Sequence, residues 1–212
     1  MQIKSFVFNS FYENTYLLIA DNKETFIVDP GCYDAHERNE LLDFIKAEQL
    51  QPKAIVNTHT HIDHVLGNSF LKEHFSIPLW IPNEEAEMYK SVEAYAPTWG
   101  INGYRGTDPD WLIPNTGNIQ LGELELEIRY APGHSAGHLI FYHQESNQLI
   151  AGDVIFNRSI GRTDLPGGDF ATLEQSIKSQ VYSLPDETII YPGHGPKTTV
   201  GDEKTMNPFV KG

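Results

Sequence analysis

A short segment in the first half of the chain concentrates groups that bind metal ions. From position 58 the sequence reads Thr-His-Thr-His-Ile-Asp-His, so three imidazoles and one carboxylate fall between His59 and His64. Grouping these side chains in one short loop is unfavourable unless cations or water satisfy their lone pairs. The apolar run 53–56 before the loop predicts a strand, and strand ends are where α/β proteins place chemistry. The segment therefore predicts a metal site.

The order of residues in this segment separates it from a solvated or tag-like histidine cluster. Tags are consecutive histidines at a terminus, whereas here small residues and an aspartate are interleaved in mid-chain. In an extended segment, residues two apart point to the same side, so His59, His61 and Asp63 would share one face. His64 would begin the opposite face. One loop could therefore supply two neighbouring metals.

Three further polar residues follow predicted strands and have glycine next to them. His134 comes after Gly133, Asp153 after Gly152, and His194 lies between two glycines. Glycine lets the backbone turn sharply and lets a side chain approach a ligand closely. With the first cluster they make seven His and Asp groups, which suffice for two four- or five-coordinate metals if one carboxylate bridges them.

The elements that must position these groups follow from periodicity. We expect strands near 2–8, 15–20, 25–28 and 53–56, with an amphipathic helix near 34–49. The second half repeats this order, with strands near 118–121, 124–130, 138–142, 149–151 and 188–191 and a helix near 170–183 capped by Asp169. Residues 97–117 form the one long irregular segment expected. No linker-like stretch interrupts the chain, which predicts a single domain over residues 1–212.

Composition limits the class of protein. The chain has 212 residues, 40% of them hydrophobic, which is enough for a sizeable core. No apolar run of about 18 residues and no signal-like N-terminus is present, so we expect a cytoplasmic protein without membrane association. The formal net charge of −14 would repel a phosphate backbone, which disfavours a nucleic-acid partner. A small-molecule substrate is the expected partner. The single cysteine, Cys32, is expected to fill space in a turn.

The chain resembles the metallo-β-lactamase-fold superfamily through 58–64, 132–134, Asp153 and 193–194. The resemblance implies an α/β fold, a four-layer αββα sandwich of two mixed sheets flanked by helices. It also implies a ligand set. His59, His61 and His134 would hold the first metal, Asp63, His64 and His194 the second, and Asp153 would bridge them. Asp63 would also be catalytic, and Asp29 would brace the site rather than bind metal.

Within the superfamily, the chain is most similar to small bacterial hydrolases of the glyoxalase II type and to persulfide dioxygenases. The segments 160–169 and 194–209 carry this similarity. It implies a metal-bound hydroxide that cleaves a thioester or ester, with two divalent ions, most simply Zn²⁺. The chain ends before the helical region that supplies glutathione-binding residues in full-length glyoxalase II, which disfavours glutathione thioesters. True β-lactamases carry cysteine where Asp153 stands, which disfavours antibiotic hydrolysis.

A different reaction remains open from the same residues. His59, His134 and Asp153 form a two-histidine, one-carboxylate set that suits one non-haem Fe²⁺ and dioxygen. That set would make the protein a persulfide dioxygenase. A third interpretation is a metal-binding module without activity, but open coordination positions would have no structural purpose there.

The remaining polar residues near these motifs have two interpretations each. Arg162, Thr163 and Asp164 either border a substrate pocket or form a plain turn with an internal ion pair. His138 is expected to support a ligand or to be a buried, hydrogen-bonded histidine. His143 is expected at the surface, without a role.

Overall fold

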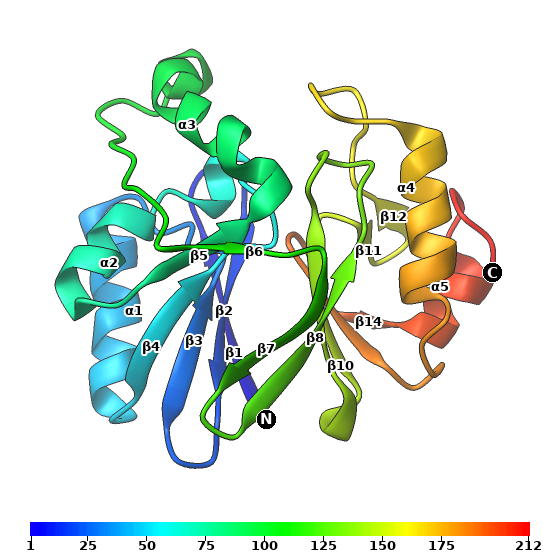
Figure 1. Ribbon diagram of the computed structural model, residues 1–212, viewed down its shortest axis with the longest axis horizontal. Coiled ribbons are helices and arrows are strands. Elements are labelled where there is room, and N and C mark those ends of the chain that lie inside the picture. The colour runs from blue at the N-terminus through cyan, green and yellow to red at the C-terminus, as the bar shows by residue number, and fades with distance from the viewer. The chain divides into compact units, whose positions relative to one another are not determined.

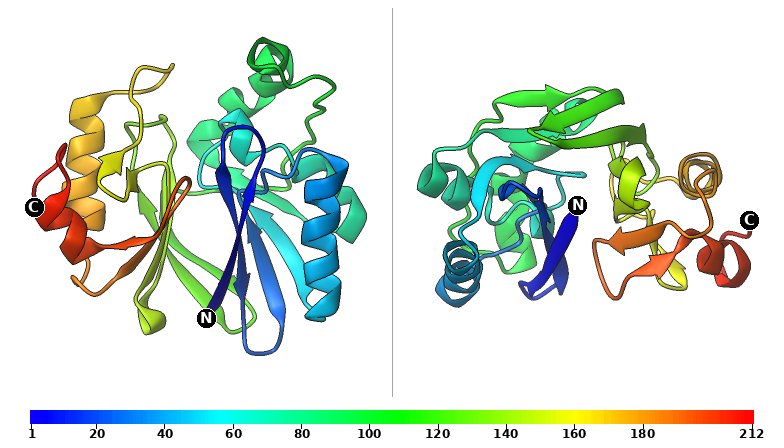
Figure 2. Two further views of the ribbon diagram at one scale, coloured as in Figure 1. Left: turned by 180° about the vertical axis from the view of Figure 1, so that it is seen from behind. Right: turned by 90° about the horizontal axis from the view of Figure 1, so that it is seen from below.

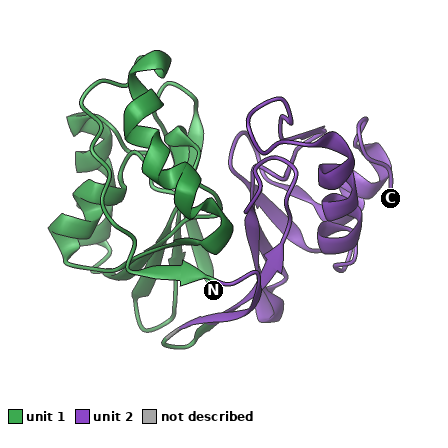
Figure 3. Ribbon diagram, turned by 45° about the horizontal axis from the view of Figure 1, so that its top comes forward, with its two compact units in different colours: residues 1–113, 121–124 green, residues 114–120, 125–212 purple. Residues whose placement is uncertain are grey.

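The chain folds into two compact units (Figure 3). The computed structural model describes the backbone of residues 1–212 and every side chain except that of Leu121. The first unit comprises Met1–Ile113 and Leu121–Leu124, and the second comprises Pro114–Gln120 and Glu125–Gly212. The single domain expected over residues 1–212 stays a prediction.

A six-stranded mixed sheet forms the centre of the first unit, in the order β1-β2-β3-β4-β5-β6 (Figure 1). The strands are β1 (Gln2–Phe8), β2 (Glu13–Ile19), β3 (Glu24–Val28), β4 (Gln51–Val56), β5 (Leu79–Pro82) and β6 (Trp111–Ile113). β1, β2 and β3 pair antiparallel, and β3 to β6 run parallel. The parallel strands end at one edge of the sheet, so the loop after β4 lies at that edge.

The helices of this unit are α1 (Ala35–Ala47), α2 (Asn68–Phe75) and α3 (Ala86–Tyr95), with 3-10 turns η1 (Ile62–His64), η2 (Asn83–Glu85) and η3 (Ala96–Trp99). α1 begins at a capping box, in which the Asp34 side chain accepts from the backbone of Glu37 and the Glu37 side chain accepts from the backbone of Asp34. It buries Leu41 and Ile45 toward the sheet. α1 and α2 lie on one face of this sheet (Figure 2).

A second six-stranded mixed sheet forms the other unit, in the order β14-β13-β10-β9-β8-β7. The strands are β7 (Thr116–Leu121), β8 (Leu124–Tyr130), β9 (Leu139–His143), β10 (Gln148–Gly152), β13 (Ile189–Pro192) and β14 (Thr198–Thr199), and a separate hairpin pairs β11 (Ile155–Phe156) with β12 (Ser159–Ile160). β10 and β13 are parallel, and their neighbours pair antiparallel. The remaining elements are η4 (Gln144–Ser146), α4 (Phe170–Ser176), the π-helical turn η5 (Ile177–Val181) and α5 (Val200–Met206).

Each unit has its own hydrophobic core. Leu17, Ile27 and Ile55 from three neighbouring strands belong to the first core, and Ile140, Leu149 and Ile190 belong to the second. Two mixed sheets with helices confirm the predicted α/β class and supply the sheet and helix layers that the predicted sandwich requires. Among the described residues, no helix is long and apolar enough to cross a bilayer.

Two expectations about elements were wrong. The segment 97–117 is not irregular throughout, because η3 occupies its start and β6 adds an edge strand to the first sheet. His143 is 4% exposed rather than on the surface, because it ends the buried strand β9.

Candidate metal centre

The histidine-rich loop leaves the end of β4 with its imidazoles gathered in the interior. His59 and His64 are fully buried and His61 is 9% exposed. The ring centroids of His59 and His61 lie 4.8 Å apart, and those of His59 and His64 lie 4.2 Å apart. The alternation expected from an extended segment stops at Ile62, where η1 begins. This turn brings Nε2 of His64 to 3.6 Å from Oδ2 of Asp63, so His64 does not point to an opposite face.

A buried aspartate from the end of β3 fixes the start of this loop. Asp29 accepts a hydrogen bond from the Thr58 backbone N–H at 2.7 Å and from the Thr58 hydroxyl at 2.6 Å. Its Oδ2 lies 3.2 Å from Nδ1 of His64. The backbone of Asp29 has φ of 47°, a left-handed conformation that non-glycine residues rarely adopt. Asp29 thus contacts both ends of the loop, while its role as a brace for bound metal stays a prediction.

A second buried carboxylate, Glu13, was missed by the sequence analysis. It is fully buried at the start of β2, where the Thr15 hydroxyl donates to its Oε2 at 2.9 Å. Its Oε1 lies 4.0 Å from Nδ1 of His64. Burial raises the pKa of Glu13 well above its usual range, partly offset by the attraction of His64. A charged residue at the head of an otherwise uncharged strand was the available signal.

The second unit brings together three predicted ligands, with two imidazoles beside the carboxylate of Asp153. His134 follows β8, Asp153 follows β10 and His194 follows β13. Oδ2 of Asp153 lies 3.5 Å from Nε2 of His134 and 3.5 Å from Nε2 of His194. The Gly193 backbone N–H donates to the Gly152 carbonyl at 2.7 Å, which holds the two turns together.

His138 supports this cluster through the backbone. The Asp153 backbone N–H donates to Nε2 of His138 at 3.0 Å. Because Nε2 accepts a hydrogen bond, the proton of this neutral ring lies on Nδ1. His138 is fully buried and hydrogen-bonded, and its support of a metal ligand stays a prediction.

The loop after β12 contacts Nδ1 of His134, the ring nitrogen that does not face Asp153. The carbonyl oxygen of Arg162 lies 2.8 Å from Nδ1 of His134. The Arg162 guanidinium donates to both oxygens of Asp164, at 2.7 and 2.8 Å, and this interaction lowers the pKa of Asp164 to about 2. The turn with an internal ion pair is thus present, and a substrate role for Arg162, Thr163 and Asp164 stays a prediction.

The geometry and charge of both clusters fit divalent ions. Two ligand atoms bound tetrahedrally at 2.0–2.1 Å lie about 3.4 Å apart. The nitrogen to oxygen distances around Asp153 and between Asp63 and His64 are 3.5 to 3.6 Å. Among the described residues, the ion-pair partner of both Glu13 and Asp29 is His64, not a lysine or arginine. Asp29 thus faces Nδ1 of His64, which directs Nε2 of the same ring toward Asp63 and a cation that both could bind.

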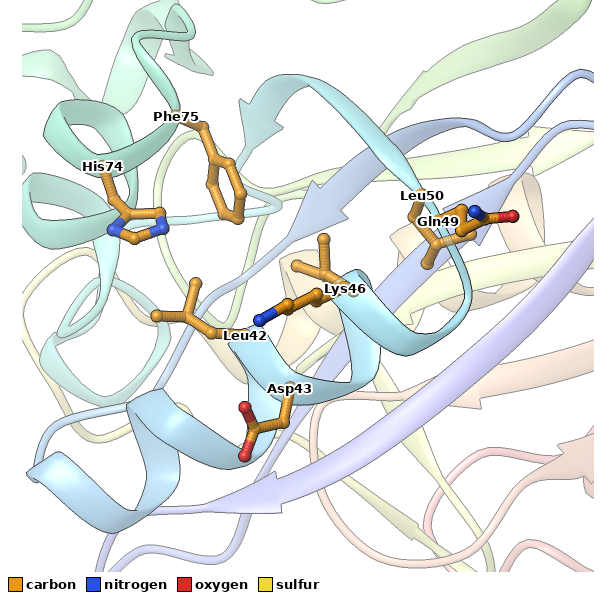
Figure 4. A pocket seen from close by; sticks show the side chains of 8 residues that line it. Leu42, Asp43, Lys46, Gln49, Leu50, His74 and Phe75 are labelled. Carbon is orange, nitrogen blue, oxygen red and sulfur yellow. The ribbon is translucent and has the colours of Figure 1, made fainter.

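The remaining candidate features have structural explanations. Cys32 is fully buried, and burial raises the pKa of its thiol to about 12, so it stays protonated. A pocket of about 470 Å³ lies between the ends of α1 and α2 (Figure 4). Its lining includes Leu42, Lys46 and Phe75 but none of the predicted ligands.

Comparison with known proteins identifies the family. A model of the metallo-beta-lactamase superfamily matches residues 10–194. The hydroxyacylglutathione hydrolase GloC of Haemophilus influenzae is 36% identical over 212 residues, covering 99% of this chain and 98% of that protein.

Two solved structures are also similar over nearly the whole chain. The BLEG-1 B3 metallo-beta-lactamase has a TM-score of 0.91 and 36% identity, with all of both chains covered. TTHA1623 in a di-iron-bound form has a TM-score of 0.86 and 34% identity, covering 98% of this chain and 100% of that one. The chain therefore belongs to the metallo-β-lactamase superfamily.

Proposed function

We propose that the protein is a metal-dependent hydrolase that cleaves a thioester or ester. The observation that carries this proposal is the position of Asp153, whose Oδ2 lies 3.5 Å from the Nε2 atoms of both His134 and His194. A carboxylate equidistant from two imidazole nitrogens, at the separation of ligands on shared ions, is suited to bridge two metals.

The proposed ligands are those that the family resemblance implies. One ion would be held by His59, His61 and His134, the other by Asp63, His64 and His194, with Asp153 as the bridge. Nitrogen and oxygen donors of this kind accept Zn²⁺, Fe²⁺ or Mn²⁺. The similarity to TTHA1623 in a di-iron-bound form supports iron as an alternative to the expected zinc.

Bound dications would lower the pKa of water toward about 7 and withdraw charge from a carbonyl oxygen. The chain's own residues prepare the donors for this task. The Arg162 carbonyl holds the proton of His134 on Nδ1, which leaves the Nε2 lone pair for coordination. His138 fixes the backbone of Asp153. Asp63, 9% exposed, is the carboxylate that we propose takes up the proton released from the attacking water.

A thioester substrate is supported by the similarity to hydroxyacylglutathione hydrolase GloC, which extends over 99% of this chain. Two other reactions share the donor set. The similarity to the BLEG-1 B3 metallo-beta-lactamase favours a β-lactam amide as a second substrate class, against the expectation from Asp153. A single iron on His59, His134 and Asp153 would instead suit oxidation of a persulfide.

Metal analysis with parallel assays tests these alternatives. The purified protein is loaded with Zn²⁺ or Fe²⁺, its metal content is measured, and it is assayed with an acylglutathione thioester, a β-lactam and a persulfide. We expect two metals per chain and thioester cleavage. One iron with oxygen uptake on the persulfide would establish the dioxygenase, and cleavage of the β-lactam alone would establish the amide hydrolase.

Substitution of a ligand tests whether hydrolysis depends on this site. His59→Ala should reduce thioester cleavage at least about 100-fold, because the metal contributes several kcal/mol to the transition state. His36→Ala is the matched control, since His36 is exposed in the first turn of α1. Undiminished hydrolysis by metal-loaded His59→Ala would disprove the proposal.

A further inference from the structure

The histidine-rich loop alternates its histidines with two threonines, and each threonine is held by one buried carboxylate. Thr58 donates its backbone N–H and its hydroxyl to Asp29, at 2.7 and 2.6 Å. Thr60 donates the same two groups to Oε2 of Glu85, at 3.1 and 3.0 Å. The two pairs repeat one arrangement, in which a carboxylate accepts both donors of a single threonine.

Glu85 reaches this loop from a different part of the first unit. It ends the 3-10 turn η2, which follows β5, and it lies 25 residues from Thr60 in the sequence. Its side chain is 1% exposed, whereas its neighbours Asn83 and Glu84 are exposed. A buried carboxylate is costly unless hydrogen bonds compensate for lost water. The turn therefore directs its single inward carboxylate at Thr60.

The position of Thr60 gives these bonds their significance. Thr60 is the residue between His59 and His61, so its backbone torsions set how far apart the two imidazoles lie and how they are inclined. The rings are 4.8 Å apart at an interplanar angle of 84°. Fixing both the N–H and the hydroxyl of Thr60 removes rotations that would otherwise separate the rings.

We propose that Glu85 is a positioning residue that holds His59 and His61 in the geometry required for one metal ion. The inference rests on the metal binding proposed above. It differs from the bracing by Asp29, whose Oδ2 also faces Nδ1 of His64 at 3.2 Å. The bonds of Glu85 described here go to Thr60, so they act on two ligands through the backbone that joins them.

Metal affinity tests this role independently of catalysis. The full-length protein and its variants are titrated with Zn²⁺ in competition with a chromophoric chelator, and the visible spectrum of the Co²⁺ form reports the coordination geometry. Glu85→Ala should weaken binding about 10- to 100-fold, as loss of supporting hydrogen bonds does at other metal sites, and should change the Co²⁺ spectrum.

Conservative variants separate positioning from general loss of structure. Glu85→Gln should retain wild-type affinity and spectrum, because an amide oxygen can accept both hydrogen bonds. Thr60→Val keeps the N–H donor and loses the hydroxyl, so it should weaken binding less than Glu85→Ala. Glu84→Ala is the matched control and should behave as wild type.

The outcomes distinguish this inference from the proposed function. Folded Glu85→Ala with wild-type affinity and an unchanged Co²⁺ spectrum would overturn the inference, even if the wild type hydrolyses thioesters. If Glu85→Ala does not fold, wild-type affinity in Thr60→Val would overturn it. Weakened binding with rescue by Glu85→Gln would support it even if no thioester is cleaved, in which case only the proposed function fails.

Discussion

Nδ1 of His134 donates a hydrogen bond to the carbonyl oxygen of Arg162 over 2.8 Å. A carbonyl oxygen only accepts hydrogen bonds, so the proton of the neutral ring must lie on Nδ1. The lone pair of Nε2 is then directed toward Asp153. The backbone position of Arg162 therefore decides which nitrogen His134 presents to a metal.

Gly161→Ala should weaken metal binding about 10- to 100-fold. A Cβ atom at Gly161 would lie 1.9 Å from the Asp153 carbonyl oxygen and 2.9 Å from Nδ1 of His134, so the backbone must shift away from both ligands. Metal content after dialysis against a weak chelator measures the loss. Gly106→Ala is the matched control, because its nearest atom would be Oε2 of Glu93 at 3.8 Å. Equal metal content in the two variants would contradict the prediction.

Removing the metals should lower the melting temperature. In the absence of a cation, the polar donor groups of His59, Asp63 and His64 stay buried in the first unit. A ligand at 1,000 times its dissociation constant contributes about 4 kcal/mol to stability, which chelation would abolish. Thermal unfolding by circular dichroism with and without EDTA measures the shift. His59→Ala should show a smaller shift than the wild type, and a melting temperature insensitive to verified metal loss would refute this account.

Asn207→Ala should destabilise the second unit. The Asn207 side-chain amide donates to the Ser159 carbonyl and to Glu203, and its oxygen accepts from the backbone of Phe209 and Val210. Asn207 and Glu203 are fully buried, and the substitution removes all four of these hydrogen bonds, at about 2 to 4 kcal/mol. Urea unfolding measures the change. Asn83→Ala, at an exposed site, should change stability little, and equal effects of the two substitutions would argue against the prediction.

The stability of the wild type should fall as pH decreases below about 6.5, with a contribution from His143. Burial lowers the pKa of His143 below its usual value. Between the two pKa values the unfolded chain binds the proton and the folded chain does not, so acid favours unfolding. His143→Asn can still accept the Ser146 N–H that caps η4, and it does not titrate. Urea midpoints from pH 7.5 to 5 should fall less steeply in this variant than in His36→Asn, and parallel curves would contradict the assignment.

The sequence predicted those parts of the fold and the site that depend on neighbouring residues. Strands near 25–28, 53–56 and 149–151 are found within β3, β4 and β10, because apolar runs bounded by turn residues act locally. The predicted ligands also depend on residue types and neighbouring glycines that lie together in the chain, and their binding of metal stays a prediction. Glycines beside His134 and His194 indicated turns that the structure contains.

Features that depend on distant partners could not be predicted. Glu85 is one of several acidic residues in its segment, and its role follows only from the approach of Thr60, 25 residues away. Glu13 similarly acquires significance from His64, which lies on another element. His143 was placed at the surface because alternation cannot tell which strands of a sheet are covered on both faces.

The alternation of threonine and histidine after Asn57 also constrains the length of the loop. Within residues 58–61, the odd positions carry histidines and the even positions carry the threonines that bind Asp29 and Glu85. Inserting or deleting one residue before this stretch would exchange the two sets. The histidine side chains would then face Asp29 and Glu85, and threonine hydroxyls would take the places of the imidazoles as metal ligands. A substitution changes one side chain of this stretch, whereas a change of register displaces two imidazoles and two threonines at once, which makes the spacing as much a part of the site as its chemistry.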